Sequence, residues 1–321
     1  INTHMHFYST FARGMFSKEA PPANFGEILE RLWWKLDKTL TLEDVYYSAM
    51  VPIIDCIKTG ATTVFDHHAG PNSALGSLFK IAEATKKAGL RSCLCYEVSD
   101  RDGEQIADNG IKENIDFINY CKKEKDPMLK GMFGLHASLT LSDKTLEKCV
   151  SRNAETGVGF HVHTAEGIED LNDSKAKYGM GVVERLNSMK ILGEKSIAVH
   201  CVHISENEIE ILKNTGTNVV HNPESNMGNA VGVSPVLKMF EKGVMLGLGT
   251  DGYTSDMFES LKVANCLHKH ANRHPSVAWA EPPHMLFENN IKIAGKYFEK
   301  LVGRLVEGAY ADVIVVDYYP P

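Results

Sequence analysis

The sequence predicts an α/β fold, a TIM-like (β/α)8 barrel, on two observations. Eight short apolar runs alternate with longer amphipathic segments along the 321 residues, a length that a single barrel domain commonly reaches. No GxGxxG motif follows the first run, which weakens the alternative of an open, doubly wound sheet. A repeated β-α unit therefore favours closure into a barrel.

The expected strands are rich in β-branched and other apolar residues and are bounded by turn residues. They span residues 1–6, 60–68, 90–96, 131–137, 157–166, 196–201, 216–223 and 244–252. The intervening stretches are interpreted as helices, for example residues 73–89, 111–126, 142–157 and 205–216. Several of them begin with Ser or Asp, which cap helix N-termini, and end with Gly, which terminates helices.

The end of the chain departs from this alternation. A helical extension is expected to complete a barrel domain over residues 1–300. The β-branched run ADVIVVD then predicts the start of a separate small β element over residues 301–321.

Composition and charge restrict the partners. Lys and Arg total 34 against 41 for Asp and Glu, which gives a net charge of −7, and no run of basic residues occurs. Nucleic acid and acidic membrane surfaces are therefore unfavourable partners. No apolar stretch approaches the ~20 residues that span a bilayer, and no secretory leader is apparent. The seven scattered cysteines favour reduced, buried thiols in a cytoplasmic protein.

Side chains that bind metals or move protons gather at the ends of the expected strands. In a (β/α)8 barrel the active site lies at the C-terminal ends of the strands. Five of the eight strands end in such residues, namely His4 and His6, His136, His163 and Glu166, His200, and Asp251. Histidines that only pack in a core have no reason to collect at one end of separate strands, so this distribution indicates a site.

Four of these residues predict a metal centre. His4 and His6 are two residues apart in an extended segment and therefore point the same way. With His163 and Asp251 they supply four nitrogen and oxygen ligands, a set that suits Zn²⁺ or Fe²⁺ and leaves one coordination position to water. His200 is expected either as a fifth ligand or as a hydrogen-bond partner of that water.

The remaining histidines have simpler explanations. His161 shares a face with His163 but lies one layer deeper, so a packing role is expected for it. His67 and His68 follow the second strand without a partner in the pattern and are also interpreted as structural. Three further histidines on helix-like or loop segments are expected to face solvent, namely His203, His268 and His270.

The chain carries, in this order, the motifs INTHMH, GLHAS, HVHTAE, VHCVHIS, HNPESN and GLGTDG. This ordered set resembles the amidohydrolase superfamily, in its branch of guanine, cytosine and S-adenosylhomocysteine deaminases and triazine chlorohydrolases. The segments TTVFDHHAG and TDGYTSDMFESLKVAN are most similar to the SsnA-type aminohydrolases. The resemblance covers essentially the whole chain.

The resemblance implies a metal-dependent hydrolase barrel that deaminates a purine- or pyrimidine-like heterocycle with a metal-bound hydroxide. Asp251 would be both ligand and base, Glu166 would protonate the ring nitrogen and carry protons to the departing ammonia, and His200 would orient the hydroxide. His136 and Trp34 would contact the substrate, although packing explains either residue as well.

One divalent ion is expected, with Zn²⁺ preferred over Fe²⁺. Relatives with two metals use a carbamylated Lys at the end of strand four, and here Lys130 precedes that strand. Ring opening of a cyclic amide and hydrolytic dechlorination remain alternatives on the same site, and a non-catalytic metal-binding subunit is an alternative of another class. A homodimer is one alternative for the oligomeric state.

Family members carry a small β-sandwich built from an N-terminal segment and the C-terminal end of the chain. The resemblance implies that this chain begins after the first of those pieces and contains only the start of the second. Two motifs also depart from the pattern of the relatives: His136 is followed by Ala-Ser-Leu-Thr instead of Pro and Tyr, and Gly-Asn-Ala follows SNM. Both segments lie where relatives touch substrate, so the substrate is not carried over.

Overall fold

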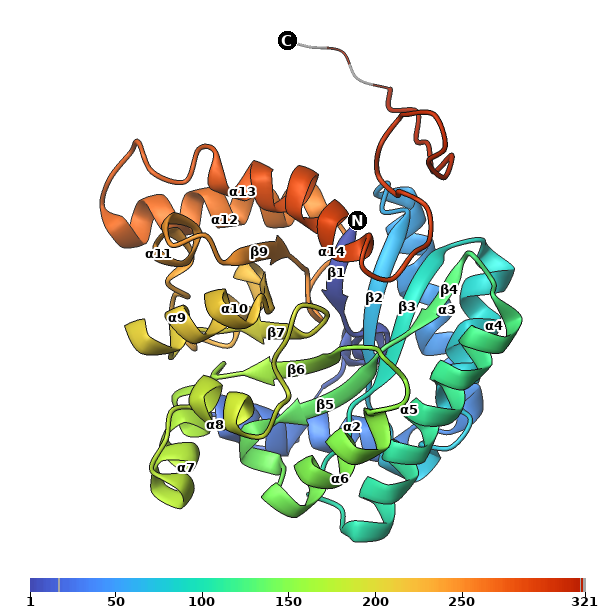
Figure 1. Ribbon diagram of the computed structural model, residues 1–321, viewed down its shortest axis with the longest axis vertical. Helices are drawn as coiled ribbons and strands as arrows, with labels where there is room; N and C mark the ends of the chain where they lie inside the picture. The colour runs from blue at the N-terminus through green and yellow to red at the C-terminus, as the bar shows by residue number, and fades with distance from the viewer. Residues whose placement is uncertain (17, 318, 320–321) are drawn as a thin grey trace.

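Parallel strands form the middle of the molecule and helices lie around them (Figure 1). The computed structural model describes residues 1–16, 18–317 and 319. Within these residues the strands are β1 (Asn2–Met5), β2 (Thr63–His68), β3 (Arg91–Tyr96), β4 (Leu129–Gly131), β5 (Phe133–Ala137), β6 (Phe160–Thr164), β7 (Ile197–His200), β8 (Asn218–His221) and β9 (Met245–Leu248).

The helices fill the connections between the strands. They are α1 (Phe25–Ile28), α2 (Trp34–Thr39), α3 (Leu42–Lys58), α4 (Ser77–Ala88), α5 (Glu104–Glu124), α6 (Asp143–Asn153), α7 (Ile168–Tyr178), α8 (Val182–Ser188), α9 (Glu206–Thr215), α10 (Pro223–Gly228), α11 (Val236–Glu241), α12 (Met257–Asn272), α13 (Glu281–His284) and α14 (Asn290–Ala294). The predicted alternation of strands and helices, and the parallel α/β class, are thus confirmed.

Helix boundaries follow the capping residues of the sequence. Ser142 and Ser205 cap α6 and α9 by accepting hydrogen bonds from backbone N–H groups three residues later. Gly89 and Gly216 end α4 and α9 in the left-handed conformation, with φ of 76° and 67°. Glycine has no Cβ to oppose that conformation, so each helix stops there.

The strands form two parallel sheets, in the orders β1-β2-β3-β4 and β5-β6-β7-β8-β9. The predicted strand 131–137 appears as two segments because the chain changes partner at Met132, with β4 pairing to β3 and β5 to β6. Two isolated parallel bridges link the sheets, Met5 to Asp251 and Val98 to Leu135. At the second link a Cβ on Gly134 would lie 2.3 Å from the Tyr96 carbonyl oxygen, so only glycine fits.

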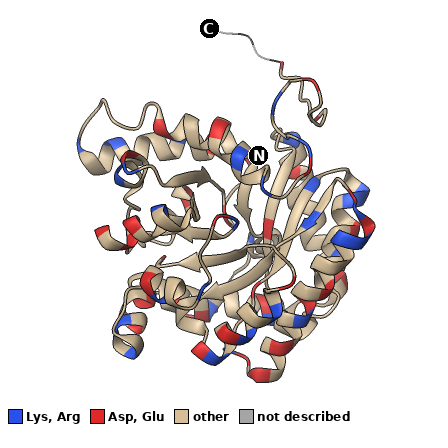
Figure 2. Cartoon of the chain, in the orientation of Figure 1, with Lys and Arg blue, Asp and Glu red and all other residues tan. Residues whose placement is uncertain are grey.

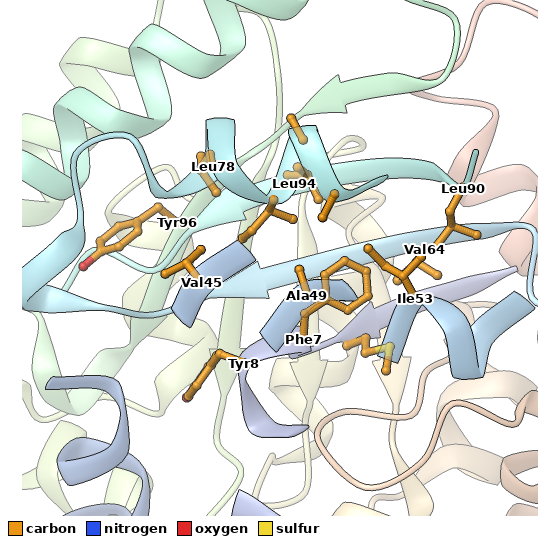
Figure 3. Packing of buried hydrophobic residues seen from close by; sticks show 14 of the residues in the cluster. Phe7, Tyr8, Val45, Ala49, Ile53, Val64, Leu78, Leu90, Leu94 and Tyr96 are labelled. Atoms are coloured by element: carbon orange, nitrogen blue, oxygen red, sulfur yellow. The ribbon is translucent and has the colours of Figure 1, made fainter. Parts of the chain in front are cut away.

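A buried apolar cluster fixes the segment that follows β1 (Figure 3). Val45, Ala49 and Ile53 are four residues apart on α3 and fully buried against the first sheet. Phe7, directly after His6, packs into the same cluster with no exposed surface. Full burial of such a side chain contributes roughly 1.5–3 kcal/mol, so this packing holds the chain in place beside the strand end.

Charged side chains lie mainly on the outer helices and loops (Figure 2). Among the described residues, no helix is both long and apolar enough to cross a bilayer. All seven cysteines are free, and all but Cys266 are buried, as the sequence predicted.

The expected β element at the C-terminus is not confirmed. Residues 303–317 form no strand, and residues 318, 320 and 321 lie outside the described part of the chain. The side chain of Arg91 forms an ion pair with Asp312 and lies 4.0 Å from the ring centre of Tyr310, which ties part of this segment to β3. An extended run needs a neighbouring strand for its backbone hydrogen bonds, and the described residues supply none there.

Candidate metal centre

Five side chains from four strands converge at the C-terminal ends of the strands. His4 lies in β1 and His6 directly after it, His163 lies in β6, His200 ends β7, and Asp251 follows β9. All five are buried, with at most 9% of each residue exposed. The ligand set expected from the sequence is therefore brought together in space.

The distances between their ligand atoms are short. The Nε2 atoms of His6 and His163 are 3.0 Å apart, and His6 Nε2 lies 3.4 Å from Asp251 Oδ1. His4 Nε2 lies 3.8 Å from the same oxygen, and His200 Nε2 lies 3.6 Å from Asp251 Oδ2. Two nitrogens about 2.0–2.1 Å from a tetrahedral zinc are themselves ~3.3 Å apart, so this spacing suits a shared cation.

Hydrogen bonds on the far side of each ring fix which nitrogen faces the centre. His6 Nδ1 contacts the backbone carbonyl of His67, and His163 Nδ1 lies 2.9 Å from the carbonyl of His136. A carbonyl oxygen only accepts hydrogen bonds, so both Nδ1 atoms carry the proton. Each Nε2 therefore presents a lone pair, as a metal-ligating imidazole does.

The other two histidines also contact a neighbouring side chain through Nδ1. His200 Nδ1 lies 2.9 Å from the amide oxygen of Asn226, and His4 Nδ1 lies 2.9 Å from His161 Nε2. The Nε2 atoms of His4 and His200 are buried and have no hydrogen-bond partner among the described residues. Buried polar atoms are rarely left unpaired, and several lone pairs facing one point with a carboxylate fit a divalent metal.

Burial keeps these imidazoles neutral. Desolvation lowers the pKa of His4 and His163 well below the usual value, and neighbouring histidines lower it further. It also lowers the pKa of His6 and His200, although Asp251 opposes the shift. Because a metal binds only the neutral ring, the site is ready for a cation at neutral pH.

The backbone is strained where the chain leaves the strands at this centre. Ala165, His200, Cys201 and Asp251 all have positive φ, at 48°, 70°, 49° and 56°. Residues with a Cβ adopt that conformation at a cost of roughly 1 kcal/mol each, and such strain clusters at functional sites. The sharp turns let each strand end present its side chain to the centre.

Glu166 lies beside the ligands, two residues after β6. Its Oε2 is 3.3 Å from His200 Nε2, and its Oε1 accepts a hydrogen bond of 3.2 Å from the side-chain amide of Asn229. Asn229 in turn accepts a 3.0 Å hydrogen bond from the hydroxyl of Tyr253. Burial raises the pKa of Glu166 well above its usual value, and the charge of Asp251 adds to this. Glu166 can therefore hold a proton at neutral pH.

A pocket opens over the centre. Its walls include five aromatic side chains, Tyr8, Phe25, Trp33, Trp34 and Tyr253, together with His136 and Glu166. The rings of Trp34 and His136 lie 6.3 Å apart, edge to face. Both residues that were expected to touch substrate thus line the pocket, whose aromatic side chains offer apolar surface to a ligand.

The structure adds residues that the sequence interpretation missed. Glu97 lines the pocket directly after β3, and Asn229 and Tyr253 form the hydrogen-bonded chain to Glu166. The strand-end rule that selected Glu166 applies equally to Glu97, so a signal for Glu97 was present. His161 and Asn226 support ligand histidines, whereas His268, expected at the surface, is 1% exposed with its Nε2 3.2 Å from His221 Nε2.

A family model described as "Amidohydrolase family" matches residues 1–321. The chain belongs to the amidohydrolase family. A 5'-deoxyadenosine deaminase of Methanosarcina mazei is 33% identical over 325 residues, covering 100% of this chain and 72% of that protein. A 5-methylthioadenosine/S-adenosylhomocysteine deaminase of Thermococcus sibiricus is 32% identical, covering 100% of this chain and 73% of that protein.

The fold of this amidohydrolase also matches solved structures. An adenosine deaminase from Xanthomonas campestris with bound zinc superposes with a TM-score of 0.84 at 23% identity, covering 97% of this chain and 69% of that one. The amidohydrolase family and the buried donor set together support a divalent metal in this chain.

Proposed function

We propose that this amidohydrolase is a zinc-dependent aminohydrolase that releases ammonia from an adenosine-like nitrogen heterocycle. The observation that carries the proposal is Glu166, a buried acid with a raised pKa, placed 3.3 Å from His200 and beside the four metal donors. A site that only binds metal has no use for such an acid. The deaminase relatives over the full length of the chain support the same reaction.

We further propose that β4 and β5 act as one strand of a closed eight-stranded barrel. The backbone N–H of His136 donates to the carbonyl of Val98 at 2.9 Å, and that of Asp251 donates to the carbonyl of His4 at 3.1 Å. These hydrogen bonds link β1 to the residues after β9, and the residues after β3 to β5. Closure would hold His4 and Asp251 on neighbouring strand ends.

The metal site would consist of His4, His6, His163 and Asp251 around one Zn²⁺, with His200 as a fifth ligand or as a partner of the bound water. When bound, a zinc ion lowers the pKa of a coordinated water from 15.7 to about 7 and so supplies a nucleophile at neutral pH. One carboxylate oxygen of Asp251 lies 3.4 Å from His6 Nε2, and the other lies 3.6 Å from His200 Nε2. Asp251 would therefore accept the proton of the attacking water.

Glu166 would work on the other reactant. Held by Asn229 and kept protonated by burial, it would donate its proton to a ring nitrogen, which makes the adjacent carbon easier to attack. The carboxylate then formed would take the proton from Asp251 and pass it to the departing amine, and the second proton of the attacking water would return to Glu166 as the carbonyl forms. His200 would orient the attacking water, and Trp34 and His136 would hold the heterocycle.

Ammonia release tests this function. The protein loaded with Zn²⁺ is assayed against adenosine, 5'-deoxyadenosine, guanine and cytosine, and we expect turnover of at least one adenosine analogue. Glu166→Gln is expected to keep the metal and to lose activity by 10²–10⁴-fold, the usual range for a general acid. Glu169→Gln, three residues further along the chain, is the matched control.

Two outcomes would contradict the proposal. Activity unchanged in Glu166→Gln would remove the acid from the reaction. Loss of a chlorinated or cyclic-amide substrate without ammonia from any purine or pyrimidine would favour dechlorination or ring opening on the same site.

A further inference from the structure

The pocket holds a second buried carboxylate that the proposed reaction does not use. Glu97 follows β3 and is 6% exposed, and it lines the pocket together with His6, His136 and His163. It lies near a different part of the centre from Glu166, because it groups with His6, His67 and His163, whereas Glu166 groups with His200 and Asp251.

One side of Glu97 is anchored. Its Oε2 lies 3.1 Å from Nδ1 of His67, whose other nitrogen lies 3.0 Å from the carbonyl of His161. That carbonyl only accepts, so the ring of His67 is fixed with a proton on Nε2 and its Nδ1 against the carboxylate. Glu97 Oε2 is buried and has no hydrogen-bond partner among the described residues. A carboxylate offers about four acceptor positions, so Glu97 can still accept a hydrogen bond from a group in the pocket.

The histidines beside Glu97 favour its charged form. Burial alone would raise its pKa, but His136 and His67 outweigh burial and bring the pKa below its usual range. Glu97 therefore faces the pocket as a hydrogen-bond acceptor.

Acidic side chains outnumber Lys and Arg at the pocket wall. Among the described residues that line it, Glu97, Glu166, Asp170 and Asp251 are acidic and none is Lys or Arg. Arg101 lies behind the wall, with its guanidinium 5.4 Å from the ring centre of Trp34, and it forms ion pairs with Asp37 and Asp102. Enzymes that bind phosphates or carboxylates generally place Arg or Lys against them.

We infer that Glu97 determines specificity, selecting uncharged heterocycles that present an N–H or O–H donor to it and rejecting substrates that carry an anionic substituent. This inference rests on the proposed function and deepens it. Among adenosine analogues it favours neutral nucleosides over nucleotides and over analogues that bear a carboxylate. Like charges brought together in a low-dielectric pocket repel strongly, which gives the selection its physical basis.

A binding measurement tests the inference without turnover. Adenosine and adenosine 5'-monophosphate, which differ only by the phosphate, are titrated into Zn²⁺-loaded Glu166→Gln protein, with tryptophan fluorescence as the readout because Trp33 and Trp34 line the pocket. We expect adenosine to bind at least tenfold more tightly. Adding Glu97→Gln is expected to narrow that ratio by about tenfold, chiefly through tighter binding of the monophosphate.

Glu83→Gln is the control, because Glu83 is exposed and forms an ion pair with Lys80 on the surface of α4. It should leave the ratio unchanged. A monophosphate that binds as tightly as adenosine, a ratio that Glu97→Gln does not alter, or the absence of binding by either ligand would overturn the inference. Ammonia release by the unsubstituted enzyme is measured separately. If no ammonia is released but the ratio of the two affinities is as expected, the proposed deamination is refuted and the inferred binding specificity is retained.

Discussion

Two carboxylates face the same pocket from different strands and behave oppositely. Glu166, after β6, lies near Asp251 and has its pKa raised by burial and by that like charge. Glu97, after β3, is equally buried, yet His136 and His67 bring its pKa down. Neighbouring charges, and not burial, therefore decide which carboxylate stores a proton.

This difference separates the tasks of the two sides of the pocket. A protonated acid can donate a proton to the substrate, whereas a carboxylate that stays charged offers only acceptor oxygens. The β6 side thus suits catalysis and the β3 side suits recognition. Substitutions on each side should consequently change different kinetic constants.

Removal of the metal donors should have the largest effect, since both sides are organised around the same centre. His163→Ala and Asp251→Asn are each expected to lower the zinc content of the purified protein to near zero and to abolish turnover. Metal analysis by mass spectrometry measures the first effect. His203→Ala is the control, because His203 binds the carbonyl of Val231 away from the centre, and full zinc content in His163→Ala would disprove the assigned ligand set.

The next largest effect is expected for the residue that holds Glu166. Asn229→Ala removes the hydrogen bond to Glu166 and should lower kcat about tenfold while KM changes little. Because that bond lowers the pKa of Glu166, its loss should move the alkaline limb of the pH–rate profile to higher pH. Tyr253→Phe keeps the Asn229 contact and should have a smaller effect. A tenfold rise in KM with unchanged kcat would place Asn229 in binding instead.

Loss of an aromatic side chain from the pocket wall should weaken substrate binding. Trp34→Ala is expected to raise KM roughly five- to tenfold, in line with ~1–3 kcal/mol for stacking on an aromatic ring, and Trp34→Phe should retain most of the affinity. Trp279→Ala, at a ring that is 67% exposed, provides the control. Equal KM values for Trp34→Ala and the unsubstituted enzyme would rule out a contact between Trp34 and the ring.

The smallest effect concerns stability on the β3 side. Burial lowers the pKa of His68 to about 3. Its side chain therefore becomes protonated near pH 6.5 in the unfolded chain but stays neutral at that pH in the folded chain. Stability from this group is complete above pH 6.5 and falls as pH drops toward 3, by about 1.4 kcal/mol per pH unit. His68→Gln should lose this dependence. Between pH 6.5 and 5.5, the difference in unfolding free energy between this variant and the unsubstituted protein should therefore shift by about 1 kcal/mol in favour of the variant, as measured by urea titrations. Parallel curves would contradict this.

Much of the fold was accessible from the sequence because it depends on local signals. The strand and helix alternation, and the caps at Ser142 and Ser205, are set by residues close together in the chain. The division of the predicted strand 131–137 at Met132 could not be predicted from the sequence, because it depends on the pairing of β4 and β5 with different strands. The run ADVIVVD has strand propensity, but its conformation depends on a partner that propensity does not supply.

The candidate site shows the same division. The donors at the strand ends could be predicted because topology alone brings those ends together. The contacts of Glu97 with His67, and of Asn229 with Glu166, link residues on separate loops and needed coordinates. His268 was misassigned because one face of α12 packs against the strand that bears His221, and a histidine on that face is buried.

The left-handed residues at the strand ends have an evolutionary consequence. Ala165, immediately before Glu166, has φ of 48°. In the folded state this conformation strains alanine more than it would strain glycine. A selection for heat resistance alone would therefore favour glycine at this position, while the added freedom would loosen the acid beside it. The amino acid that best resists unfolding and the one that best serves turnover should differ at this residue.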